Sequence, residues 1–193
     1  MSKILLVVAH PNIEASIANK TIIENFISLH PETEIDELYK LYPDFKNKKK
    51  KEQEKLLKAD FIILQFPMFW YNAPALMRKW FEDVLEHGFA YGSKGKALQG
   101  KKLIVSITTG SPVEEYREGG IQSFTIDDLT KGFHQLANLC SMNWAGYVAT
   151  GNLVFFLRDK PEELAKMKES LKQHAEKLSA KVKGQYNYHF LHK

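Results

Sequence analysis

Three short segments of this sequence combine polar, aromatic and small residues, and each directly follows a run of apolar residues. The first, His10–Ala18, holds a histidine and a serine just before a helical pattern. The second, Pro67–Pro74, places three successive aromatic residues between two prolines. The third, Thr108–Pro112, is small and rich in hydroxyl groups, and Tyr116 follows it closely. Because ligands of open parallel sheets bind beyond the carboxyl ends of the strands, these segments predict one shared binding site.

The first segment has the residue types of an anion site. Ser16 stands where the cap of the following helix belongs, and the unpaired N–H groups of a helix start attract phosphate. With His10 nearby, the segment predicts a phosphate held mostly by backbone donors. The alternative interpretation is that Ser16 only caps the helix and that His10 is an ordinary loop residue.

The second segment suits a flat, conjugated ligand. Its prolines impose a stiff, irregular backbone on Phe69, Trp70 and Tyr71. Aromatic faces can pack on a planar ring, and backbone N–H groups can reach the heteroatoms of that ring. The alternative interpretation is that these aromatic residues only pack against the core.

The third segment suits the polar edge of such a ring. Thr108, Thr109 and Gly110 let the backbone approach a ligand closely. Tyr116 could donate a hydrogen bond to a carbonyl or to a developing enolate. The alternatives are an ordinary Thr-Gly turn and a tyrosine that faces solvent.

The elements that must position these segments alternate along the chain. Apolar or alternating runs predict strands at residues 3–9, 34–38, 61–66, 102–108 and 144–149. Helical spacing predicts helices over residues 17–27, 75–85 and 126–139, and over a last helix that ends near Gly184. Asp159 is predicted to cap that helix, with Glu162 completing a capping box and Pro161 in the first turn. The pattern predicts an α/β fold with a parallel sheet covered on both faces, in one domain over residues 1–193.

Composition narrows the function classes. The chain has 193 residues, a formal charge of +4 and one cysteine, Cys140. A lone cysteine excludes an intramolecular disulfide and a cysteine-based zinc cluster. The longest apolar run, Ile4–Ala9, is too short to cross a bilayer, so a cytoplasmic location is expected. No Gly-x-Gly-x-x-Gly or Gly-x-Ser-x-Gly motif is present, and residues 95–102 only approximate a P-loop and precede a strand.

Two further features carry no firm function. The lysine run at residues 46–51 is either an anion or partner patch or a solvated loop or helix start. His189 and His192 are three residues apart but have no acidic or cysteine partner nearby in the sequence. The sequence therefore predicts no metal site.

Together the segments resemble the flavodoxin-fold NAD(P)H:quinone oxidoreductases, a family that also includes ancillary proteins of bacterial potassium-efflux systems. The resemblance runs in order from residue 3 to about residue 150. Its residues are Ile4–Pro11 with Ser16, Gln65–Phe81, Gly88–Gly92 with Leu98, Gly100 and Lys101, and Thr108–Gly110 with Tyr116, Gly119 and Gly120. The aromatic segment and the following Trp80-Phe81 are specific as a pair.

The resemblance implies a flavodoxin-like three-layer sandwich with a five-stranded parallel sheet in the order 2-1-3-4-5 and helices on both faces. It also implies a flavin, FMN or FAD, with NADPH or NADH as electron donor and a quinone or similar acceptor. The residues that match cofactor contacts are His10, Ser16, Ile17 and Ala18 for the phosphate and ribityl chain, Pro67, Met68, Phe69, Trp70 and Tyr71 for the isoalloxazine, and Thr108, Thr109, Gly110 and Tyr116 for its polar edge.

The resemblance further implies that Trp70, Tyr71 and Tyr116 take part in the reaction. It implies a homodimer with the active site at the subunit interface, to which Trp80, Phe81 and residues 88–92 could contribute. A membrane transporter is a second possible partner. One departure is Gln122, which stands where larger family members carry a histidine beside the tyrosine; a glutamine cannot take up a proton near neutral pH.

Overall fold

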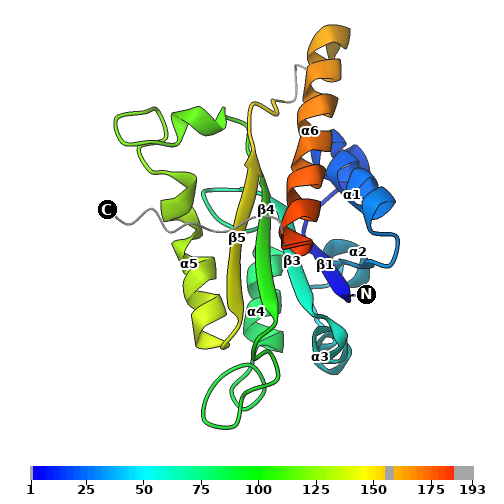
Figure 1. Cartoon of the computed structure of the whole chain (residues 1–193), viewed down its shortest axis with the longest axis vertical. Helices are drawn as coiled ribbons and strands as arrows, with labels where there is room; N and C mark the ends of the chain where they lie inside the picture. Colours follow the sequence, from blue (N-terminus) through cyan, green and yellow to red (C-terminus); the bar gives the residue numbers. More distant parts are fainter. Residues whose placement is uncertain (1, 155–158, 185–193) are drawn as a thin grey trace.

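Five parallel strands form one sheet in the computed structural model, which describes residues 2–154 and 159–184 (Figure 1). The strands are β1 (Ile4–Val8), β2 (Glu34–Glu37), β3 (Phe61–Pro67), β4 (Lys102–Thr108) and β5 (Asn143–Thr150). Their order is β2-β1-β3-β4-β5, and each neighbouring pair is parallel. The predicted α/β fold and strand order are therefore confirmed.

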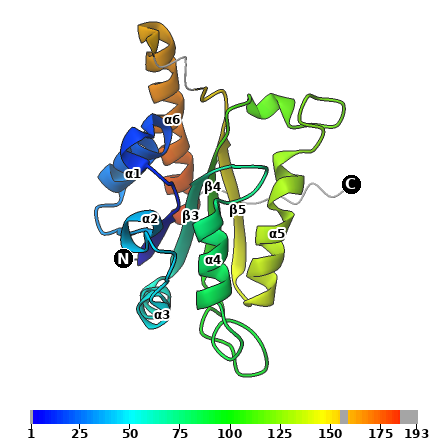
Figure 2. The ribbon, with the colours of Figure 1, turned by 180° about the vertical axis from the view of Figure 1, so that it is seen from behind.

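Helices cover both faces of the sheet, as seen from the two sides in Figures 1 and 2. On one face lie α1 (Ile17–Leu29) and α6 (Pro161–Val182), and on the other lie α3 (Lys49–Lys58), α4 (Ala75–Val84) and α5 (Ile126–Leu139). The short α2 (Leu38–Leu41) follows β2. Single 3₁₀ turns, η1 (Ile13–Ala15) and η2 (Val113–Glu115), lie in the loops after β1 and β4.

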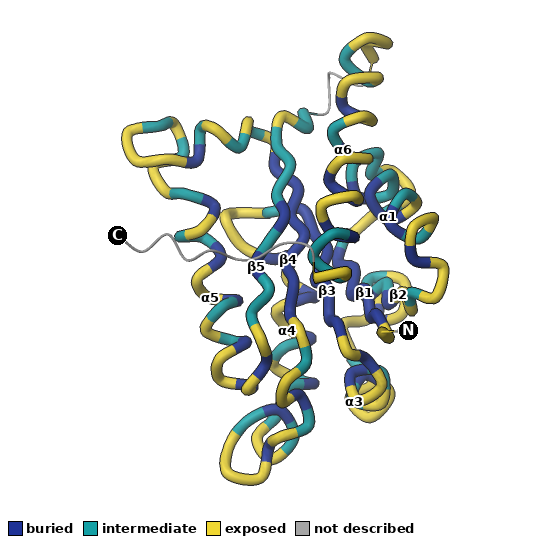
Figure 3. Tube along the Cα trace, in the orientation of Figure 1, coloured by how far each residue is buried: buried dark blue, intermediate teal, exposed yellow. Residues whose placement is uncertain are grey.

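The first strand shows how the sequence builds this layering. All residues of β1 are buried, and successive side chains of a strand point to opposite faces. Ile4, Leu6 and Val8 pack with α1 and α6, whereas Leu5 and Val7 pack with the helices of the other face. Figure 3 shows the resulting buried centre of the sheet between exposed outer helix surfaces. A continuous apolar run is therefore what a central parallel strand requires.

The structure corrects the prediction at two helix starts. Asp159 does not cap α6; Lys160 holds the cap position without a side-chain hydrogen bond, and the helix begins at Pro161. The sequence pattern does not reveal α3, because its buried positions are only Glu52 and Leu56 and form no apolar stripe. The lysine run ends in the first turn of this helix, in agreement with the helix-start interpretation.

The structure places one residue of the expected subunit interface in the core, and it does not describe the two histidines near the end of the sequence. Trp80 is buried in the core at 1% exposure, so it cannot cover a site on a neighbouring subunit. His189 and His192 lie outside the described residues. Within residues 2–154 and 159–184, none of the helices has the length and apolar character of a membrane span.

A buried cluster of charged groups ties β2 to α3 and α4. Lys55 Nζ lies 2.6 Å from Asp36 Oδ1 and 2.7 Å from Glu52 Oε1. The hydroxyl of Tyr42 and the indole N–H of Trp80 both donate to Glu52, at 2.6 and 2.8 Å. Asp36 Oδ2 is buried without a hydrogen-bond partner. A proton on Asp36 would let this carboxyl group donate to Glu52, with which it shares a hydrogen bond, and would so remove the cost of an unpaired buried group.

The two carboxyl groups of this cluster have opposite pKa shifts. Burial, together with the hydrogen bond and charge of Glu52, raises the pKa of Asp36 to about 8. Burial alone would raise the pKa of Glu52 as well, but hydrogen bonds from Asp36, Lys55, Tyr42 and Trp80 lower it. Asp36 therefore keeps its proton at neutral pH and Glu52 carries the charge. Because unfolded Asp36 loses its proton near pH 4, its contribution to stability is complete below about pH 4 and is lost as the pH rises to about 8.

Asp36→Asn tests this assignment. The amide can still donate toward Glu52 and accept from Lys55, but it has no proton to lose. We expect the free energy of unfolding of the variant to gain on the wild type by on the order of 1 kcal/mol per pH unit between about pH 5 and 8. Urea unfolding at several pH values in that range measures the difference. Glu54→Gln, which changes an exposed carboxylate of the same helix, is the control, and parallel curves for Asp36→Asn and wild type would refute the assignment.

Candidate functional site

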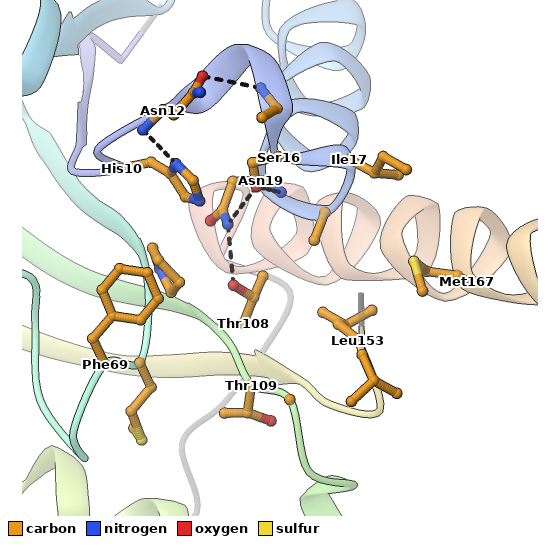
Figure 4. A pocket seen from close by; sticks show the side chains of 16 residues that line it. His10, Asn12, Ser16, Ile17, Asn19, Phe69, Thr108, Thr109, Leu153 and Met167 are labelled. Carbon is orange, nitrogen blue, oxygen red and sulfur yellow. Dashed lines mark hydrogen bonds between the residues drawn. The ribbon is translucent and has the colours of Figure 1, made fainter. Parts of the chain in front are cut away.

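A cavity of about 450 Å³ opens at the carboxyl ends of β1, β3 and β4 (Figure 4). This volume lies within the roughly 300–1,000 Å³ of small-molecule sites. The structure brings parts of all three predicted segments together around it, along with a fourth stretch and α6. The lining residues are His10, Asn12 and residues 15–19 from the first loop, residues 67–69 from the second, residues 108–110 from the third, and Leu153, Val154 and Met167.

The start of α1 gives one end of the cavity the character of an anion site. Ser16 caps the helix, and its Oγ accepts the N–H of Asn19 at 3.2 Å. The first N–H groups of a helix have no acceptor within the helix, which leaves those of Ile17 and Ala18 for a ligand in the cavity that both residues line. The helix dipole adds partial positive charge at this point. An anion can therefore bind here without a cationic side chain.

His10 adds a donor to this end of the cavity. Its Nδ1 accepts the N–H of Asn12 at 3.1 Å, so the neutral ring carries its proton on Nε2. Burial lowers the pKa of His10, and the ring is neutral at pH 7. The centroid of its ring lies 6.3 Å from that of Phe69, which comes from the second loop and also lines the cavity. His10 therefore lies between the anion-binding end of the cavity and its aromatic end.

The loop after β4 forms a small-residue wall. Thr109 Oγ1 donates to the carbonyl of Ser111 at 2.8 Å, and its N–H donates to the carbonyl of Thr150 at 3.0 Å. Gly110 follows at an open position, where an added Cβ would meet no atom within 4 Å. The rigid threonine and the open glycine leave room for the edge of a ligand.

Tyr116 lies behind this wall and does not line the cavity. It is 9% exposed and packs in the core, so it is not a solvent-facing loop residue. The pKa of Tyr116 is raised, mainly by burial; a hydrogen bond with Thr109 lowers it in part, and the nearby Tyr71 raises it further. Gln122 donates to Ser111 Oγ at 2.8 Å. The structure therefore places Tyr116 beside Thr109 rather than in the lining of the cavity, and its expected direct contact with a ligand stays a prediction.

Trp70 and Tyr71 form the strained tip of the aromatic loop. Phe69 and Asn72 exchange two backbone hydrogen bonds of 3.0 Å around them. Both residues have positive φ, 50° and 61°, as a type I′ turn requires, although such turns favour asparagine and glycine. Trp70 is 94% exposed, and neither residue lines the cavity. Strained, exposed aromatic residues beside a cavity indicate a role other than core packing.

Trp70→Asn tests the strain. Asparagine adopts positive φ at lower cost than tryptophan, and an almost fully exposed side chain loses little packing. We expect the free energy of unfolding to rise by about 0.5–1 kcal/mol. Urea denaturation at a protein concentration low enough for the chain to be monomeric measures it, with Trp70→Ala as the control that keeps the steric cost of a Cβ and gains less. A variant less stable than the wild type would show that Trp70 packs favourably despite its exposure.

The structure adds lining residues that the sequence did not reveal. Asn19 lies fully buried at the back of the cavity, within the first turns of α1. Its polar type on the buried face of a helix was the available signal. Leu153, Val154 and Met167 lie far from the three segments in the sequence, and their spacing gives no sign that they share a site.

Comparison with known proteins agrees with this geometry. A family described as "Flavodoxin-like fold" matches residues 2–175. An uncharacterized NAD(P)H oxidoreductase of Bacillus subtilis, YrkL, is 41% identical over 142 residues, which cover 74% of this chain and 81% of that protein. The potassium-efflux ancillary protein KefG of Serratia proteamaculans is 39% identical over 163 residues, 84% of this chain and 86% of that one. The crystal structure of general stress protein 14 of Treponema denticola in complex with FMN superposes with a TM-score of 0.83 at 28% identity, and the match covers 93% of this chain and 99% of that one.

Proposed function

Because the chain belongs to the flavodoxin-like fold family, we propose that it is a flavin-dependent oxidoreductase that passes two electrons from NAD(P)H to a quinone or similar acceptor. The observation that carries the proposal is the cavity, which has anion-binding donors at one end and Phe69 with a small-residue wall at the other. The likeness to an NAD(P)H oxidoreductase and to an FMN-containing structure supports it.

The donor set at the start of α1 fits the phosphate of FMN. The hydroxyl of Ser16, the N–H groups of Ile17 and Ala18, and His10 Nε2 would hold it. Each of these groups donates a hydrogen bond, as phosphate oxygens require. The residues present therefore suit a phosphate ester better than a neutral ligand.

The remaining lining residues would hold and orient the ring. Pro67, Met68 and Phe69 would flank it on the β3 side, and Thr109 and Gly110 on the β4 side. A bound flavin supplies hydride and electron transfer, and the protein supplies position and electrostatics. Phe69 is 42% exposed at the mouth, where NAD(P)H and the acceptor would reach the ring in turn.

Gly110→Leu tests whether this cavity holds FMN. The new side chain has open space, so the fold is expected to keep its stability, but it would occupy the ligand volume. We expect FMN to raise the melting temperature of the wild type, since ligand at 100 times its Kd adds about 2.7 kcal/mol, and not that of the variant. Gly132→Leu, an exposed helix position with equally open surroundings, is the control. A wild type that FMN and FAD both fail to stabilise would overturn the proposal.

Tyr116→Phe tests the indirect role of the tyrosine. Without the hydroxyl, Thr109 loses a hydrogen-bond partner and the wall beside the ring loses polarity. We expect reduction of bound FMN by NAD(P)H to slow about tenfold with FMN affinity nearly unchanged. Stopped-flow bleaching at the flavin absorbance measures this. Tyr91→Phe, in the loop before β4 at the opposite edge of the sheet, is the control, and equal rates for all three proteins would remove Tyr116 from the reaction.

We also propose that the active unit is a homodimer whose interface covers the aromatic tip. Trp70, Ile121 and Phe124 are 94%, 82% and 62% exposed on loops at the carboxyl edge of the sheet. Large exposed apolar side chains at the edge of the sheet that holds a site indicate a contact surface. Light scattering at micromolar concentration is expected to give twice 22.2 kDa for the wild type and a monomer for Trp70→Glu with Ile121→Glu. A monomeric wild type would refute the dimer.

A second candidate function is that of an ancillary subunit of a potassium-efflux transporter. The likeness to KefG over 84% of this chain favours it. Both functions share the flavin, so they differ in their partner. Quinone turnover by the isolated protein at ordinary enzymatic rates supports the oxidoreductase, whereas negligible turnover with co-purification of a transporter supports the ancillary role.

A further inference from the structure

A chain of buried polar side chains leads from the back of the cavity across one face of the sheet to α6. Its members, here called the polar chain, are Asn19 of α1, Gln65 of β3, Ser106 of β4, His174 of α6 and Thr150 of β5. The first four are at most 2% exposed. Buried polar groups are costly unless they are hydrogen-bonded, and a phosphate site alone does not account for so many.

Each member of the polar chain bonds to the next. Gln65 Nε2 lies 2.7 Å from Asn19 Oδ1. Ser106 Oγ lies within hydrogen-bonding distance of Gln65 Oε1 and 2.7 Å from His174 Nε2. His174 Nδ1 lies 2.8 Å from Thr150 Oγ1. The chain therefore connects the cavity with a residue 155 positions after Asn19 in the sequence.

The amide of Asn19 has one orientation that satisfies its donors. Its Nδ2 group lies 3.1 Å from Ser16 Oγ and 3.2 Å from Thr108 Oγ1, so both of its N–H bonds have an acceptor (Figure 4). If the amide turned over, Gln65 would be the single acceptor on the other side of the group. One buried N–H would then be unpaired, at a cost of about 1–3 kcal/mol.

This orientation sets the direction of every other bond in the polar chain. Gln65 donates to Asn19, so its oxygen accepts the proton of Ser106. The oxygen of Ser106 then accepts from His174, whose proton must lie on Nε2 while Nδ1 accepts from Thr150. Burial lowers the pKa of His174 to about 3, which agrees with a neutral ring in a fixed tautomer.

At the cavity end, the same direction leaves two hydroxyl protons for a ligand. Ser16 Oγ already accepts two hydrogen bonds, from the backbone N–H and the side chain of Asn19. Thr108 Oγ1 also accepts from that side chain. Both residues line the cavity, and a hydroxyl whose oxygen accepts in this way is free to donate its proton.

We propose that the polar chain is a positioning device that makes this cavity select a phosphate ester over the corresponding alcohol. Asn19 is the positioning residue that presents Ser16 and Thr108 as donors, and the members behind it hold its amide in the donating orientation. The inference rests on the proposed flavin function and adds to it the source of the phosphate preference.

A double-mutant cycle tests the proposal with FMN and riboflavin, which differ by the phosphate. The readout is the ratio of the two dissociation constants, from quenching of flavin fluorescence. Thr108→Val removes one presented donor and is expected to lower the preference for FMN about tenfold in the wild-type chain. In an Asn19→Leu chain, where the hydroxyl is no longer oriented, the same change is expected to alter the ratio by less than about twofold.

Asn25→Leu is the matched control, because Asn25 is a half-buried asparagine of the same helix whose side chain donates to the carbonyl of Thr21 at 2.8 Å and does not line the cavity. It should leave the ratio unchanged. The wild-type chain gives a second measurement that does not depend on any variant folding. ¹⁵N NMR of FMN-loaded protein is expected to show His174 protonated on Nε2 throughout the neutral pH range.

The outcomes separate the inference from the function. If the wild type binds neither FMN nor riboflavin, the proposed function fails. Suppose that the wild type prefers FMN to riboflavin, but Thr108→Val lowers this preference equally in the wild-type and the Asn19→Leu proteins. The polar chain then does not orient the donor, and the inference is wrong. A His174 ring protonated on Nδ1 would also overturn it, since the direction of the bonds would then be reversed.

Discussion

Burial of β1, β3 and β4 on both faces decides where this protein can carry out chemistry. A strand enclosed between two helix layers has no access to water, so its side chains must be apolar or must find hydrogen-bond partners within the core. Gln65 of β3, Ser106 of β4 and Thr108 at the end of β4 are the buried polar exceptions in these two strands, and each has a hydrogen-bond partner. Other polar groups collect where the strands end. The cavity lies at that edge because the interior of the sheet excludes it.

The sequence predicts the parts of the fold that depend on local pattern. The apolar run of β1 and the serine cap of α1 are local features, and the structure has both. The cap of α6 is mispredicted by one residue: Asp159 is expected, because aspartate is a common cap, but Lys160 holds the cap position and the helix begins at Pro161. Helix α3 is missed because its buried positions are a carboxylate, Glu52, and a single leucine, Leu56, which do not form an apolar stripe.

The site divides in the same way. The three loops can be found from the sequence because each follows a strand. Whether a given side chain of these loops points into the core or into solvent cannot be predicted in this way. Trp70 turns outward because a two-residue turn reverses the chain there, and Tyr116 turns inward because it packs in the core. Asn19 and His174 belong to one network through pairings between distant elements. Residue spacing within one helix contains no information about such pairings.

The aromatic tip shows that the fold accepts a local cost beside the site. Two adjacent residues with side chains hold positive φ at a turn that glycine or asparagine would occupy with less strain. The tip contributes little to the core, since Trp70 is almost fully exposed. A sequence shaped by stability alone would not place tryptophan at that position. The homodimer proposed above would give Trp70 the cover that the single chain does not provide.

The electrostatics of the cavity follow from the same structure. Although the chain carries a formal charge of +4, none of the described residues that line the cavity is Lys, Arg, Asp or Glu. An anion there would be held by hydroxyl groups, backbone N–H groups, a neutral histidine and a helix dipole. Attraction between exposed charges weakens in salt, whereas directed hydrogen bonds in a partly buried site are screened much less. In such a site the choice of ligand depends on which atoms donate and which accept, and in this molecule that choice reaches back through Asn19 into the core.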